Sequence, residues 1–161
     1  MLGIVYYSKN GNTEILAELI EEKYNGRLIK LEEKTKRRGL IGFLKSGYQA
    51  SSGKQSKLIN TPWEDIKDCS ELYLCTPIWA GKTTPAMNTF LANADFKNKE
   101  VIIVTVMADP KLGGASRVHE SMKEIVEGKG GSVIKCVGFN GTSPFEKGEK
   151  NHIKRQFDTC L

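Results

Sequence analysis

The sequence predicts an α/β fold in three layers, with helices on both faces of a doubly wound sheet of five parallel strands. Short apolar runs alternate with helical patterns of about 10–15 residues, which is typical of βαβ units. The run 101–107 is almost wholly apolar, as expected for a strand that helices cover on both faces. Of 161 residues, 39% are hydrophobic and 27% charged, so we expect a single domain over residues 1–161.

In the first half of the chain, apolar runs predict strands over 2–7 and 27–31. Between these strands, apolar residues three and four positions apart predict a helix over 12–24. The segment 32–60 is irregular. Within it we expect one helix near 40–50, where four apolar or aromatic side chains can share a face: Leu40, Phe43, Leu44 and Tyr48.

In the second half, proline and glycine mark where elements begin and end. Prolines predict a short helix over 62–66 and a longer helix that starts near Pro85. A helix over 116–127 ends at a cluster of glycines. The remaining strands are expected over 72–75, 101–107 and 133–139, and a last helix over 147–159.

The composition indicates the cellular compartment in which the protein is expected. No apolar run approaches the ~18 residues of a membrane span, and the first strand starts at residue 2, without room for a secretory leader. We therefore expect a cytoplasmic protein. The four cysteines lack C-x-x-C or metal-ligand spacing, so we expect reduced, structural thiols, with Cys75 and Cys136 acting as small hydrophobic residues in strands.

The net charge of +5 is concentrated in one segment. Residues 34–57 carry seven basic side chains and no acidic one. This basic segment is either a solvated excursion after the second strand or a surface that attracts an acidic protein, a pyridine-nucleotide phosphate or an anionic substrate. Few aromatic residues are interleaved and no nucleic-acid motif is recognised, so we do not expect a nucleic-acid partner.

The turn after the first strand has the features of an anion site. The strand leads at once into a helix, whose first N–H groups and dipole favour negative charge. The side chains that can donate hydrogen bonds to phosphate oxygens there are Ser8, Asn10, Asn12 and Thr13. A ligand that carries a phosphate is therefore expected at this turn.

Two further loops follow strands at the edge where parallel sheets bind ligands. In the loop 76–84, Trp79 stands between Pro77 and Gly81, a position that exposes an indole unless a planar group stacks on it. The loop 108–115 contains glycines that allow a close backbone approach. The three loops together predict a mononucleotide-like ligand with a large π system.

These motifs resemble those of the flavodoxin family. The stretch 8–13 resembles its phosphate loop, 77–81 resembles its first flavin-contacting loop, and the spacing of all five strands agrees. The resemblance covers essentially the whole chain. It implies the strand order 2-1-3-4-5, for which flavodoxin is a type example, with FMN at the switch between strands one and three. It also implies a role in electron transfer rather than catalytic residues of its own.

The resemblance further implies which residues contact FMN. The phosphate would be held by Ser8, Asn10, Gly11, Asn12 and Thr13. The flavin ring would be contacted by Pro77, Ile78, Trp79, Ala80, Gly81 and Lys82, with the indole stacked on the ring and Ala80–Gly81 facing flavin N5. Its other side and pyrimidine edge would meet Met107, Ala108, Asp109, Gly113 and Gly114. A cation such as Lys82 would favour the anionic reduced flavin.

Two features depart from the family pattern. Its electron carriers are usually strongly acidic, whereas this chain is basic, and the third loop lacks an aromatic residue for the second flavin face, which Tyr48 could supply. The alternatives are a flavin-dependent NAD(P)H or quinone reductase and a scaffold domain without flavin. The expected partners are redox proteins or a pyridine-nucleotide-dependent reductase, and the chain would be a monomer or a homodimer.

Other motifs are better explained as structural. The stretch 76–83 ends like a Walker A loop, but it lacks the first glycine and Pro77 removes a needed N–H, so we do not expect nucleoside triphosphate hydrolysis. Trp63 is expected in the core or as a surface cover. His119, in the middle of a predicted helix, and His152, near the start of another, are expected to be exposed and structural. No pairing of a histidine with a cysteine or a serine can be argued from the sequence.

Overall fold

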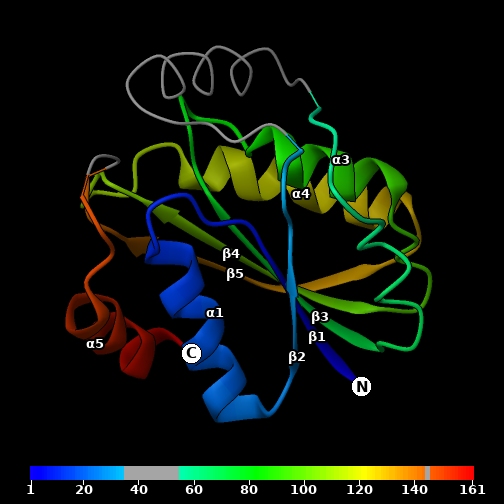
Figure 1. The fold of residues 1–161 in the computed structure, drawn as a ribbon, viewed down its shortest axis with the longest axis horizontal. Coiled ribbons are helices and arrows are strands. Elements are labelled where there is room, and N and C mark those ends of the chain that lie inside the picture. Colours follow the sequence, from blue (N-terminus) through cyan, green and yellow to red (C-terminus); the bar gives the residue numbers. More distant parts are fainter. Residues whose placement is uncertain (35–54, 144–145) are drawn as a thin grey trace.

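The computed structural model of the chain describes residues 1–34, 55–143 and 146–161. Along the chain, strands and helices alternate as predicted except between the second and third strands, where the described residues contain no helix (Figure 1). The elements are β1 (Leu2–Tyr6), α1 (Asn12–Tyr24), β2 (Arg27–Lys30), β3 (Glu71–Pro77), α3 (Pro85–Asn93), β4 (Glu100–Met107), α4 (Ala115–Gly128), β5 (Ser132–Asn140) and α5 (Lys150–Cys160).

The five strands form one parallel sheet in the order β2-β1-β3-β4-β5, which confirms the predicted order. The registers of the two central pairs bring Tyr6 beside Cys75 and Thr76 beside Thr105. Because all strands run the same way, the loops that follow them leave the sheet at one edge, and this edge carries the candidate site.

Helices cover both faces of the sheet, so the three layers are also confirmed. Figure 1 shows α1 and α5 on one face and α3 and α4 on the other. One apolar core contains Leu16 of α1 and Phe157 of α5, and the second contains Phe90 of α3 and Met122 of α4. The crossover direction changes between β1 and β3. The loops after these two strands therefore diverge and leave space between them.

Expectations about the segment between β2 and β3 need correction or lie outside the described residues. The predicted helix at 62–66 is a run of turns, with hydrogen bonds from Glu64 N–H to Thr61 O and from Asp65 N–H to Pro62 O. Trp63 partly covers the core there, as expected. The predicted helix at 40–50, Tyr48 and most of the basic segment lie outside the described residues.

The cysteines match the prediction except at one position. All four thiols are free, and Cys69 and Cys75 are buried. Burial raises the pKa of both thiols, which keeps them protonated. Cys136, however, is exposed, because β5 is an edge strand that the neighbouring helices cover only in part. Among the described residues, no helix combines the length and apolar character needed to cross a bilayer.

Candidate functional site

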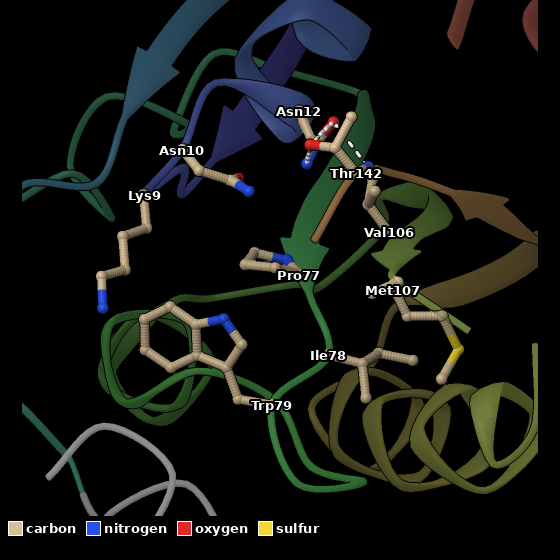
Figure 2. A pocket seen from close by; sticks show the side chains of 10 residues that line it. Lys9, Asn10, Asn12, Pro77, Ile78, Trp79, Val106, Met107 and Thr142 are labelled. Atoms are coloured by element: carbon tan, nitrogen blue, oxygen red, sulfur yellow. Dashed lines mark hydrogen bonds between the residues drawn. The ribbon is translucent and has the colours of Figure 1, made fainter. Parts of the chain in front are cut away.

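A cleft opens at the carboxyl edge of the sheet, where the loops after β1, β3 and β4 meet (Figure 2). Its cavity volume is about 40 Å³, below the ~300–1,000 Å³ typical of small-molecule sites, so it encloses only part of a ligand of that size. Its walls are formed by Lys9, Asn10, Asn12, Pro77, Ile78, Trp79, Val106, Met107, Ala108 and Thr142. The three loops that the sequence singled out therefore do form one site.

The turn into α1 borders this cleft through Asn10 and Asn12. Gly11 precedes the helix with a φ of 94°, in the left-handed region that glycine adopts without strain. Its N–H donates to Ser8 Oγ over 3.2 Å, which leaves the serine O–H able to donate elsewhere. The first intrahelical bond runs from Ile15 N–H to Gly11 O, so the N–H groups of residues 12–14 precede it.

The side chains of Asn10 and Asn12 contact the chain itself. Asn10 Nδ2 donates to Ser143 O and Glu146 O, and Asn12 Nδ2 donates to Thr142 Oγ1. Thr13, in the first turn of α1, is buried. Among the predicted side-chain donors at this turn, the asparagine amides are thus engaged within the chain, whereas no such contact is seen for the Ser8 and Thr13 hydroxyl hydrogens in the described residues.

Trp79 forms the apolar end of the cleft. Its indole is half-buried and meets the Tyr7 ring edge-on, with 5.6 Å between ring centroids and an interplanar angle of 83°. Lys9 Nζ lies 5.6 Å from the centroid of the indole. In Figure 2 the indole lies on the opposite side of the cleft from Asn12 and Thr142. The cleft therefore has a polar end at α1 and an aromatic end at the loop after β3.

The residues after Trp79 form a tight turn. Trp79 and Lys82 exchange two backbone hydrogen bonds of 2.9 and 3.0 Å. Ala80 and Gly81 between them both have positive φ, 49° and 70°, which is the geometry of a type I′ turn. All three residues of this turn after Trp79 are exposed, and none of them lines the cleft: Ala80, Gly81 and Lys82.

In the loop after β4, only the first residues reach the cleft. Met107 and Ala108 line it, whereas the Asp109 carboxylate accepts hydrogen bonds from the N–H groups of Lys111 and Gly113. Gly114 has a φ of 86° and precedes α4. The Asp109 carboxylate thus stabilises its own loop. Neither this residue nor Gly113 or Gly114 lines the cleft.

Three residues of the cleft were not predicted from the sequence: Lys9, Val106 and Thr142. Thr142 belongs to the segment that joins β5 to α5, which is called the β5–α5 segment below (described residues 141–143 and 146–149). Because it follows a parallel strand, its place at the carboxyl edge could have been predicted from the same rule that placed the other loops.

A polar pair lies behind the cleft, between the sheet and α4. Thr105 of β4 is buried, and its Oγ1 lies 2.7 Å from Nε2 of His119. His119 is half-buried rather than exposed as expected, and burial lowers its pKa. His152 is also half-buried, with Nε2 at 3.0 Å from Asn140 Oδ1. In the described part of the chain, no three His, Cys, Asp or Glu side chains gather as a metal site would require.

The lowered pKa of His119 predicts a loss of stability in mild acid. The unfolded chain takes up a proton on this imidazole near its ordinary pKa of about 6.5, more readily than the folded chain does. The stability that the neutral His119 contributes is therefore fully present above the ordinary pKa. It is lost as the pH falls through the lower pKa of the folded state. The thermal midpoint of the wild type should fall more between pH 7.5 and 5.5 than that of His119→Gln. Parallel pH profiles would contradict this assignment.

The architecture and the cleft define a flavodoxin-like fold. A candidate flavoprotein from Bacteroides uniformis is similar in structure, with a TM-score of 0.73, 20% identity and 98% and 97% of the two chains covered. A flavoprotein in complex with FMN from Lactobacillus acidophilus gives 0.68 at 17% identity, over 99% and 97% of the chains. Megasphaera elsdenii flavodoxin gives 0.60 at 19%, over 87% and 86%.

The likeness to these proteins is one of fold. No protein-family model matches the sequence, and no curated protein is similar to it. The structural neighbours include flavoproteins and flavodoxins. Their similarity shows that this chain has the flavodoxin-like fold.

Proposed function

We propose that the cleft binds FMN and that the loaded protein carries electrons. The observation that supports this most strongly is one cleft at the β1–β3 switch that is lined both by the start of α1, where a negative charge would be favoured, and by the indole of Trp79. A mononucleotide with a large planar ring has the same two ends. The FMN complex of the Lactobacillus acidophilus protein, which has this fold, also supports it.

The residues present fit the parts of FMN. The N–H groups at the start of α1 and the Ser8 hydroxyl would donate to the phosphate, and the helix dipole would favour its charge. The half-buried indole of Trp79 would support the isoalloxazine ring, and Met107 and Ala108 would lie beside it. When bound, FMN supplies reversible one- and two-electron chemistry, while the protein supplies orientation and electrostatics.

The charge of the chain bears on its partners. A net charge of +5, with seven basic residues in 34–57, favours an acidic partner or a pyridine-nucleotide phosphate. We propose a redox partner protein or a pyridine-nucleotide-dependent reductase as the electron donor. The free cysteines agree with a reducing, cytoplasmic compartment. The exposed Lys82 follows the Trp79 turn, and its charge would favour the anionic reduced flavin.

The proposed function is tested by reconstitution and reduction. Apoprotein titrated with FMN should bind one equivalent, shift the flavin absorption bands and quench flavin fluorescence. The loaded protein should be reduced quickly by NADPH only when a pyridine-nucleotide-dependent reductase is added. Steady NADPH oxidation without a reductase would instead indicate an enzyme on this fold. A protein that takes up no FMN would contradict the proposal.

A further inference from the structure

The Asn12 side chain is held by Thr142, which lies 130 residues further along the chain. Asn12 Nδ2 donates to Thr142 Oγ1 over 3.0 Å, and Asn12 Oδ1 accepts from Thr142 N–H over 3.2 Å. Figure 2 shows the two side chains facing one another at the polar end of the cleft. Both ends of the Asn12 amide are therefore engaged with one residue.

The Thr142 hydroxyl is also used within the chain. It accepts from Asn12, and its single hydrogen has acceptors at Asn12 Oδ1, Glu146 O and Lys147 O, at 3.3, 3.4 and 3.1 Å. Neither the amide nor the hydroxyl can turn toward a phosphate without breaking these contacts. The pair is thus built to join two segments rather than to contact a ligand.

Asn10 and Gly148 extend the same junction. Asn10 Nδ2 donates to Ser143 O and Glu146 O, each at 3.1 Å, and Gly148 N–H donates to Asn10 O at 2.8 Å. A Cβ on Gly148 would lie 2.6 Å from Asn12 N and 2.8 Å from Gly11 C. The backbone of the β5–α5 segment therefore lies directly on the turn that begins α1.

We propose that Asn12 and Thr142 form a latch that holds the β5–α5 segment on the phosphate turn, and that both are positioning residues for the cofactor. The latch fixes the N–H groups of residues 12–14, so it acts on phosphate affinity through the backbone of α1. This inference rests on the proposed function. It replaces the expectation that the Asn12 amide donates to the phosphate.

A double-mutant cycle read with two ligands tests the latch. Affinities of Asn12→Ala, Thr142→Val and the double variant are measured for FMN and for riboflavin, which lacks the phosphate. The controls are Asn93→Ala and Thr159→Val, whose side chains bond within α3 and α5. Circular dichroism and thermal midpoints of the apoproteins verify that each variant is folded.

If the latch acts as proposed, each single variant loses about tenfold in FMN affinity, which corresponds to the free energy that one hydrogen bond contributes. Riboflavin affinity should stay within about twofold of the wild-type value. The double variant should bind FMN no more weakly than the weaker-binding single variant, because the Asn12–Thr142 contact is already lost in each single variant. If Thr142→Val binds FMN as the wild type does, the inference is wrong. It is also wrong if the two losses multiply, or if riboflavin binding falls equally.

These outcomes are separate from failure of the proposed function. Wild-type protein that does not bind FMN contradicts that function, and this inference with it. Wild-type binding with an unchanged Thr142→Val variant contradicts the latch alone.

Discussion

Trp79→Ala should weaken FMN binding by about 10- to 100-fold, because stacking on an aromatic side chain contributes ~1–3 kcal/mol per base in nucleic-acid complexes. The indole forms the aromatic end of the cleft and is supported edge-on by Tyr7. Riboflavin affinity should fall by the same factor, since both ligands carry the same ring. Calorimetric titration with FMN, riboflavin and inorganic phosphate measures each contribution.

Phosphate affinity should not change in this variant, because the turn into α1 lies at the other end of the cleft. Trp63→Ala is the matched control: it removes the second tryptophan, which partly covers the core and does not line the cleft. An equal loss for FMN and for inorganic phosphate in Trp79→Ala would show that the two ends of the cleft do not act separately.

Gly148→Ala should lower the free energy of unfolding by about 1–3 kcal/mol, the usual cost of forcing extra volume into a packed position. The new Cβ would meet backbone atoms of Gly11 and Asn12 at 2.6–2.9 Å, and backbone cannot rotate away as a side chain can. The β5–α5 segment must lift from α1, so FMN affinity should fall by at least about tenfold. Denaturant unfolding and FMN titration measure the two effects.

Gly128→Ala provides the control for this substitution. Gly128 ends α4, and a Cβ there meets no heavy atom within 4 Å. Alanine at this position should be neutral or stabilising by up to about 1 kcal/mol. If Gly148→Ala unfolds at the same denaturant concentration as Gly128→Ala and binds FMN normally, the β5–α5 segment does not press on the phosphate turn.

The sequence could predict the sheet and the approximate position of the site because both depend on local patterns. Apolar runs such as 101–107 mark buried strands, and parallel strands send their loops to one edge. This rule brought the turn after β1, Trp79 and Met107 together, as the structure confirms. The expectation that the turn binds an anion rests on a strand that leads directly into a helix.

Other features depend on contacts between distant residues, which a single sequence does not reveal. The pairing of Asn12 with Thr142 spans 130 positions, so the sequence does not show that this amide bonds within the chain. The sequence likewise does not show that the Asp109 carboxylate accepts hydrogen bonds from the N–H groups of its own loop. The exposure of Cys136 instead follows from the edge position of β5, which the predicted strand order already contains.

The most direct measurement is a ¹⁵N-labelled NMR titration of the apoprotein with FMN and then, separately, with riboflavin. We expect FMN to shift the backbone amides of residues 8–14 together with the indole N–H of Trp79. Riboflavin should shift the indole N–H while leaving most of the amides of 8–14 in place. Binding of FMN that moves neither group of signals, or that moves only signals away from the cleft, would contradict it.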